Sequence, residues 1–311
     1  MKNILVLGGL GYLGGRITKY ICDLGYSVRV TTRQNSKDFP KNIPVNCEVI
    51  QVDYTKNFQL DKIMSGIDCA IDLVGPDSHT IYDDAEHLIN DHVELTNSLS
   101  QAAEKNLVSQ FIYFSTIHVY GKNLAGEVTS KTLPKPNKPF ARAHFEAENV
   151  LISQNVAMQK IIIRCANTFG YPYFENKKCW QLVVNQFCKM AIDDGRIMIN
   201  SPKAHRNFIP IIQVCKEIEA LLSAKENNMI VNMGDSKSVP VIHMAKRIKL
   251  YLNQYLMMNC VIENNGDKSY NNSNPFILCP KTRKVKKENF TTYEIVSLIN
   301  YLKGDTKIEV N

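Results

Sequence analysis

The chain has 311 residues, of which 44% are hydrophobic and 22% charged, with a formal net charge of +7. This composition is typical of a soluble globular protein with enough apolar material for a sizeable core. No run of about 18 apolar residues occurs, so no membrane span is predicted. The nine cysteines are odd in number and form no CxxC pair, which argues against a disulfide framework and a metal site and favours a cytoplasmic location.

Part of the positive charge comes from a basic cluster near the C-terminus, formed by Lys281, Arg283, Lys284, Lys286 and Lys287. Such a cluster can bind nucleic acid, but no aromatic residues interleave with it and no nucleic-acid motif accompanies it. We therefore expect a solvated surface or a wall that faces an anionic small molecule, and no nucleic-acid partner.

In chain order, short apolar segments alternate with amphipathic ones. The predicted strands are 2–7, 27–31, 48–52, 69–74, 110–114 and 160–164, with helices between them such as 14–24 and 84–105. The strands are apolar on both faces, as buried parallel strands are. The pattern predicts an α/β fold with a Rossmann-like, doubly wound parallel sheet.

The second half is less regular and is broken by loop-like stretches such as 264–275. We expect it to form a smaller, mixed α/β substrate domain. The predicted boundaries are 1–170 for the sheet domain, with 203–225 packed on it, and 171–311 for most of the second domain.

The first predicted strand runs directly into a glycine loop. Gly8, Gly11 and Gly14 form a GxxGxxG pattern, with Tyr12 and Leu13 between the last two, and a helix follows. In this setting the glycines permit a tight turn, close approach of a pyrophosphate and close packing of helix on strand. The pyrophosphate lies at the helix N-terminus, where unpaired N–H groups favour negative charge. The loop predicts a dinucleotide site.

The second predicted strand ends without the carboxylate that binds the ribose of NAD in such sites. Arg33 stands there instead, and its guanidinium suits a 2′-phosphate. The residue favours NADP over NAD and leaves both open. Asp53, after the third strand, either meets the adenine amino group or caps the next turn. Tyr54 beside it and Val74 after the fourth strand complete the expected cofactor contacts.

Three later segments carry a family resemblance. Residues 112–121 (IYFSTIHVYG), 163–172 (IRCANTFGYP) and 206–209 (RNFI) resemble signature segments of the extended short-chain dehydrogenases/reductases, in matching order and spacing. These are NAD(P)-dependent nucleotide-sugar epimerases, dehydratases and reductases. The resemblance implies a cofactor-binding N-terminal domain and a nucleotide-sugar substrate. It assigns Thr116 to the catalytic Ser/Thr position, and Asn167 and Arg206 to the substrate site.

The family's catalytic Tyr–x–x–x–Lys motif is replaced in this chain. Phe140 stands at the tyrosine position and His144 at the lysine position, on a predicted helix that keeps Glu148 in the family's place. Positions i and i+4 share a helix face, so the geometry of the motif is retained while its chemistry changes.

Two further exchanges bear on the reaction. Ile117 and His118 occupy the positions where sugar 4,6-dehydratases carry an Asp–Glu pair, so we do not expect that dehydratase mechanism. Asp72 begins the segment Asp-Leu-Val-Gly, where the family usually has His-Leu-Ala-Ala.

Three interpretations follow. In the first, the protein is an active enzyme with a rebuilt acid/base site, because imidazoles titrate near neutral pH. His118 or His144 then acts on the substrate, or His144 holds the cofactor ribose. In the second, the protein is a catalytically impaired, cofactor-binding pseudoenzyme with a sensing or partner role. In the third, it binds sugar nucleotides without redox chemistry. The resemblance also implies a homodimer through helices near 84–105 and 140–153.

Overall fold

A computed structural model of the chain describes residues 2–76, 83–122, 124–224, 229–264, 274–279 and 289–305. The basic cluster at 281–287 and most of the expected loop at 264–275 lie outside these residues. Within the described part, no helix combines the length and the apolar character needed to cross a membrane.

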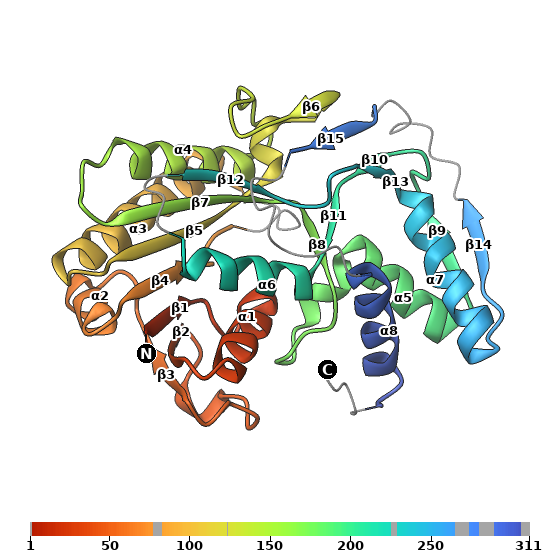
Figure 1. The fold of residues 1–311 in the computed structure, drawn as a ribbon, viewed down its shortest axis with the longest axis horizontal. Helices are drawn as coiled ribbons and strands as arrows, with labels where there is room; N and C mark the ends of the chain where they lie inside the picture. Colours follow the sequence, from red (N-terminus) through yellow and green to blue (C-terminus); the bar gives the residue numbers. More distant parts are fainter. Residues whose placement is uncertain are drawn as a thin grey trace.

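A seven-stranded parallel sheet forms the centre of the molecule (Figure 1), which confirms the predicted fold class. Its strand order is β12-β7-β5-β4-β1-β2-β3. The strands are β1 (Asn3–Leu7), β2 (Ser27–Thr32), β3 (Cys47–Gln51), β4 (Cys69–Asp72), β5 (Gln110–Thr116), β7 (Gln159–Cys165) and β12 (Met229–Met233).

Helices cover both faces of this sheet. The helices α1 (Tyr12–Asp23) and α6 (Ile211–Leu222) pack on one face, and α2 (Asn57–Met64), α3 (Ala85–Lys105) and α4 (Pro139–Ser153) pack on the other. Side chains alternate along a strand, so β1 sends Ile4 and Val6 to the first face and Leu5 and Leu7 to the second, all fully buried. The continuous apolar strands of the sequence therefore reflect a sheet buried on both sides.

A third hydrophobic cluster organises the C-terminal part, and Figure 1 shows its helices gathered beyond α1 and α6. It contains α5 (Val183–Asp194), α7 (Val241–Leu256) and α8 (Phe290–Leu302). The short strand pairs are β9 (Arg196–Ile199) with β14 (Val261–Asn264), β10 (His205–Arg206) with β13 (Val239–Pro240), β8 (Asn167–Phe169) with β11 (Phe208–Pro210), and β6 (Gly126–Val128) with β15 (Phe276–Leu278). Three 3-10 helices are η1 (Ser36–Asp38), η2 (Ile117–Tyr120) and η3 (Lys177–Gln181).

Two features of the sheet differ from the sequence prediction. Strand β12 was not predicted, and it places residues 229–233 at the sheet edge beside β7, although the predicted boundary puts them in the second domain. Strand β4 ends at Asp72 rather than at residue 74, because the chain turns there and the Val74 N–H donates to Asp72 Oδ1 at 2.9 Å.

The strand order reverses its direction between β1 and β4, which pair from Ile4 opposite Cys69 to Leu7 opposite Asp72. Loops that leave neighbouring strands at such a point diverge to opposite sides of the sheet and open a crevice at the carboxyl ends. The fold therefore places a cleft between the glycine loop after β1 and the loop after β4.

Candidate active site

The glycine loop has the geometry that its sequence predicts. Gly8 has φ +77°, a conformation that L side chains rarely adopt. A Cβ on Gly14 would lie 2.3 Å from the Gly8 carbonyl oxygen, so α1 packs against the turn in a way that only glycine allows. Gly11 is the N-cap of α1. The N-terminus of α1 thus borders an open cradle that fits a pyrophosphate.

Two cavities adjoin along the carboxyl edge of the sheet and share Gly75 and Pro76 in their walls. The first has a volume of about 500 Å³ and extends from the glycine loop to β10 and β11. The second has a volume of about 1210 Å³ and lies over the ends of β3 and β4 beside α3. The two cavities therefore meet at Gly75 and Pro76, and we refer to them together as the cleft.

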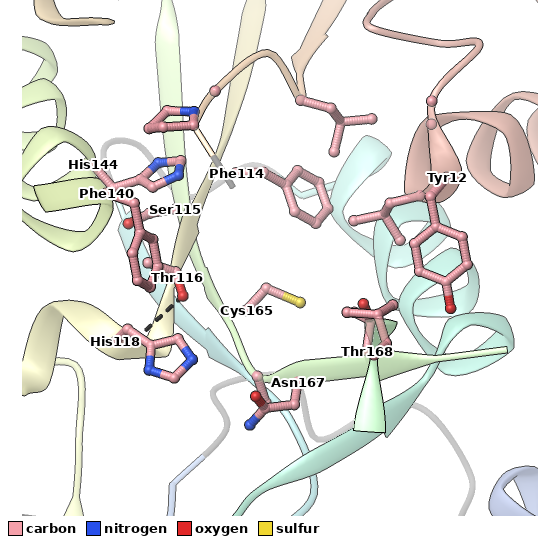
Figure 2. Close-up of a pocket in the computed structure, with 18 of the residues that line it drawn as sticks. Tyr12, Phe114, Ser115, Thr116, His118, Phe140, His144, Cys165, Asn167 and Thr168 are labelled. Atoms are coloured by element: carbon pink, nitrogen blue, oxygen red, sulfur yellow. Dashed lines mark hydrogen bonds between the residues drawn. The ribbon is translucent and has the colours of Figure 1, made fainter. Parts of the chain in front are cut away.

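Four residues singled out from the sequence form the wall of the first cavity opposite the glycine loop: Thr116, His118, Phe140 and His144 (Figure 2). Thr116 ends β5, and its Oγ1 accepts from the His118 backbone N–H at 3.3 Å. This contact starts η2 and turns the His118 side chain toward the cavity. Both residues are partly buried.

Phe140 and His118 pack edge to face, with ring centroids 5.5 Å apart and an interplanar angle of 70°. Phe140 is only 6% exposed and lies in the first turn of α4. It carries no proton for transfer. The His118 imidazole and the Thr116 hydroxyl line the same cavity, and Lys138 Nζ lies 6.0 Å from the Phe140 ring centroid.

His144, one turn further along α4, is 8% exposed, and its Nδ1 lies 2.8 Å from the Tyr113 hydroxyl. Burial lowers the pKa of His144 to about 4, a hydrogen bond to the Pro76 backbone opposes that shift, and His118 adds a small lowering. The imidazole is therefore neutral at neutral pH. It cannot supply the positive charge that a lysine would bring to the same position.

A buried ion pair holds α4 on the sheet beneath these residues. Arg164 of β7 donates to Glu148 of α4 with an Nη2–Oε2 distance of 2.6 Å, and the Ser115 hydroxyl donates to the same carboxylate. Breaking a buried pair by removing one partner costs about 3–5 kcal/mol. Glu148 therefore fixes the position of the helix that carries Phe140 and His144.

The residues expected at the adenosine end of a cofactor line the second cavity: Arg33, Asp53, Tyr54 and Val74. The Tyr54 hydroxyl lies 2.8 Å from Thr31 Oγ1. Asp53 Oδ1 accepts from the backbone N–H and the hydroxyl of Thr55, at 3.1 and 2.7 Å. It therefore caps the following turn, which is one of the two alternatives left open by the sequence, and it also borders the second cavity.

Asp72 is the last residue of β4, two positions before Val74 in the cavity wall. It is fully buried, and its Oδ2 has no hydrogen-bond partner in the part of the chain that the structure describes. Burial raises the pKa of its carboxyl to about 7, although the hydrogen bond from Val74 opposes the shift. The sequence shows that the segment beginning at Asp72 differs from the one usual in the family. It does not show the burial that raises the pKa of the carboxyl toward neutrality.

The far end of the first cavity contains Asn167 and Arg206, as expected for a substrate subsite. Asn167 Nδ2 donates to the Asn207 carbonyl at 2.8 Å, which fixes the amide where β8 pairs with β11. Both side chains are partly exposed. A guanidinium and an amide there can bind phosphate oxygens.

Sequence reasoning did not single out several residues of this cavity, some of which lie inside the segments that carry the family resemblance. They are Leu73, Gly75, Pro76, Phe114, Ser115, Lys138, Cys165, Ala166, Thr168, Leu182, Val183, Val184 and Phe208. Some are neighbours of predicted site residues, so sequence adjacency was an available signal for them. Residues 182–184 at the start of α5 enter through long-range packing that no local pattern predicts.

Comparison with known proteins supports the assignment of this geometry. Residues 4–234 match the model of the NAD dependent epimerase/dehydratase family. The chain belongs to this family.

Among curated relatives, the dTDP-D-glucose 4,6-dehydratase of Mus musculus is 27% identical over 156 residues, which cover 49% of this chain and 42% of the mouse protein. The dTDP-glucose 4,6-dehydratase of Streptomyces griseus is 22% identical over 246 residues, covering 75% of this chain and 73% of the relative. The match thus spans less than half the length of the mouse relative.

Solved structures show the same fold. The UDP-N-acetylglucosamine 4-epimerase from Bacillus cereus has a TM-score of 0.78 at 18% identity and covers 99% of both chains. MoeE5 in complex with UDP-glucuronic acid and NAD has a TM-score of 0.79 at 14% identity, covering 97% of this chain and 99% of its own.

Proposed function

We propose that this protein is an NAD(P)-dependent enzyme that acts on a nucleotide-linked sugar through a non-standard acid/base site. The observation that carries the proposal is the composition of the first cavity. One wall is the glycine loop, the opposite wall holds Thr116 and His118, and the far end holds Asn167 and Arg206. Residues suited to binding a cofactor, transferring a proton and binding a phosphate therefore line one cavity.

The roles of the side chains follow from their positions. A nicotinamide bound here supplies hydride transfer to or from a sugar carbon. His118 exchanges the proton of the reacting sugar hydroxyl, because its ring lies at the cavity beside Phe140. Thr116 holds the same oxygen by a hydrogen bond from its hydroxyl. Arg206 and Asn167 bind the diphosphate and so orient the sugar.

Arg33 supports NADP as the preferred cofactor. It borders the second cavity at the end of β2, where its charge also lowers the pKa of Tyr54 slightly, against a larger upward shift from burial. Tyr54 and Asp53 line the same cavity and offer contacts to the adenosine. A guanidinium at this place pairs with a 2′-phosphate.

The position of Phe140 favours the second candidate function, a catalytically impaired, cofactor-binding protein. Phe140 fills the tyrosine position with a buried ring that cannot transfer a proton. Such a protein retains the glycine loop and binds the cofactor without turnover, in a sensing or partner role.

One experiment separates the two functions. The purified protein is loaded with NADP or NADPH, candidate nucleotide sugars are added, and the nicotinamide absorbance is followed together with calorimetric binding. A change in absorbance or an epimerised product supports the enzyme. Binding of the sugar nucleotide without either change supports the impaired protein.

As part of the same proposal, the protein acts in the cytoplasm as a homodimer through α3 and α4, which pack side by side on one face of the sheet. An ion pair between Arg142 of α4 and Glu86 of α3 lies on their solvent side. The molar mass in solution, measured by light scattering, tests this assembly: a monomer would contradict it.

A further inference from the structure

A chain of three buried side chains runs behind the cleft. His92 of α3, Tyr113 of β5 and His144 of α4 are 5%, 0% and 8% exposed. The Tyr113 hydroxyl lies 2.8 Å from His92 Nε2 and 2.8 Å from His144 Nδ1. The two imidazoles pack edge to face with ring centroids 4.9 Å apart. Residues from three elements thus share one hydroxyl group.

This chain lies in the wall between the two cavities. His144 lines the first cavity and His92 lines the second. Gly75, common to both cavities, lies against the two rings: a Cβ there would be 2.9 Å from His144 Cε1 and 3.2 Å from His92 Cε1. Any larger residue at position 75 would displace an imidazole, so the absence of a side chain allows both rings to reach the cleft wall.

The hydrogen-bond directions in this chain follow from its partners. Proline has no backbone N–H, so the hydrogen bond between His144 and the Pro76 backbone requires a ring N–H donating to the Pro76 carbonyl. His144 Nδ1 faces Tyr113, which leaves Nε2 as the donor to Pro76. A neutral imidazole carries one proton, so Nδ1 accepts from the Tyr113 hydroxyl. The Tyr113 oxygen in turn accepts from His92 Nε2.

We propose that His92 and Tyr113 are positioning residues that hold His144 in a single neutral tautomer, with its Nε2–H directed to the cleft wall at Pro76. In this form the one N–H of His144 is held by the Pro76 carbonyl, and the nicotinamide half of the cleft is lined by a neutral ring edge in place of a cation. The effect on cofactor binding rests on the proposed function. The assignment of the His144 tautomer does not depend on that function.

The surrounding charges are consistent with this neutral form. Burial lowers the pKa of His92 to about 3 and that of His144 to about 4. Asp72 of β4 and Glu148 of α4 both raise the pKa of Tyr113, and His118 of η2 slightly lowers that of His144. Glu148 is paired with Arg164, and the Thr96 hydroxyl of α3, which donates to the His92 carbonyl, lowers the pKa of Tyr113 against the larger upward shift from burial. The group that titrates nearest to neutrality is therefore Asp72 rather than either imidazole of the chain.

Nitrogen NMR of the imidazole rings in the protein without cofactor tests the tautomer directly. We expect His144 to show a protonated Nε2 and an unprotonated Nδ1 from about pH 5 to pH 8, assigned by the loss of its signals in a His144→Gln variant. A protonated Nδ1, or an even mixture of tautomers, would overturn the proposal. The signals that report the tautomer come from the native chain, and the His144→Gln variant serves only to assign them.

Variants test the positioning role. Tyr113→Phe removes the donor to Nδ1 and should give mixed tautomers and an affinity for NADPH lower by about 3- to 10-fold. The matched control, Tyr20→Phe, loses a hydroxyl that contacts Glu219. It should change neither the His144 tautomer nor the affinity for NADPH. His92→Gln retains a side-chain N–H donor and should preserve the tautomer, whereas His92→Leu should not.

The two proposals fail in different ways. If Tyr113→Phe leaves the His144 tautomer unchanged, the positioning role is wrong whatever the activity. If the native protein shows the expected tautomer but does not bind a nicotinamide dinucleotide, the proposed function is wrong while the positioning of His144 stands.

Discussion

His118 and Phe140 lie edge to face on the cavity wall opposite the glycine loop, with ring centroids 5.5 Å apart. An imidazole therefore lies beside the ring that has replaced the family's tyrosine. Under the proposed function, His118 on η2, the turn that follows β5, takes the place of a residue on α4 as the proton-transfer group.

The double substitution Phe140→Tyr with His144→Lys tests whether the site is rebuilt or degraded. Lysine at position 144 would place an ammonium group against Tyr113 and Pro76, where a neutral ring now lies. If the site is rebuilt, initial rates with NADP and the best nucleotide sugar should fall at least about 10-fold. The single variant Phe140→Tyr is the control for the added hydroxyl. A double variant faster than the native protein would support the impaired-protein alternative.

Gly14→Ala should abolish cofactor binding. The added Cβ would lie 2.3 Å from the Gly8 carbonyl oxygen, and the turn has to open to admit it. We expect a loss of about 1–3 kcal/mol in the free energy of unfolding and no NADPH fluorescence enhancement. Gly66→Ala is the matched control: its φ of +72° also makes alanine strained, but nothing lies within 4 Å. That control should lower stability and leave cofactor affinity unchanged.

The glycine loop and strand β12 show how much of the fold could be predicted from the sequence. The glycine loop was predictable because strand, turn and helix follow one another within residues 3–23, and each glycine has a local steric reason. Strand β12 was missed because it contains Asn232, a buried polar residue that interrupts its apolar pattern. Tyr120 donates to Asn232 Oδ1 at 2.6 Å, a partner 112 positions away that no local pattern reveals.

The same limit applies to the candidate site. Thr116, Phe140 and His144 were located by their spacing within segments that resemble a family. The contacts around them could not be predicted in this way, because residues 92, 113 and 144 converge only when α3 and α4 pack on β5. Burial, and not residue type, then decides that His144 is neutral and that Asp72 titrates near neutrality.

Arg33→Gln should change the choice of cofactor. Loss of a charged hydrogen-bond partner for the 2′-phosphate should weaken NADP binding by about 10- to 100-fold and leave NAD binding nearly unchanged. Dissociation constants from nucleotide titrations of the two proteins give the comparison. Lys37→Gln removes an exposed charge in η1 and serves as the control. Equal losses for both cofactors would argue against a 2′-phosphate contact.

Asp72 should make stability depend on pH. Burial raises the pKa of its carboxyl to about 7, above the value of about 3.9 expected in the unfolded chain. Between these values the folded state binds more protons, so the Asp72 contribution to the free energy of unfolding falls as pH rises from about 4 to about 7.

Asp72→Asn removes that dependence, since an amide does not ionise. The variant should be more stable than the native protein by about 1–3 kcal/mol at about pH 8, and the difference should shrink toward about pH 4. Urea unfolding at several pH values measures it, with the exposed Asp83→Asn as the control. A difference that is constant with pH would show that Asp72 is ionised throughout.

The central claim, that His118 is the acid/base group of an active enzyme, is tested most directly by the rates of His118→Gln. With NADP and the best nucleotide sugar, the account predicts that kcat falls about 10²- to 10⁴-fold and that the dissociation constant of the cofactor changes little. His87→Gln, on the exposed face of α3, is the matched control and should keep the native rate. Native turnover in His118→Gln would contradict the account.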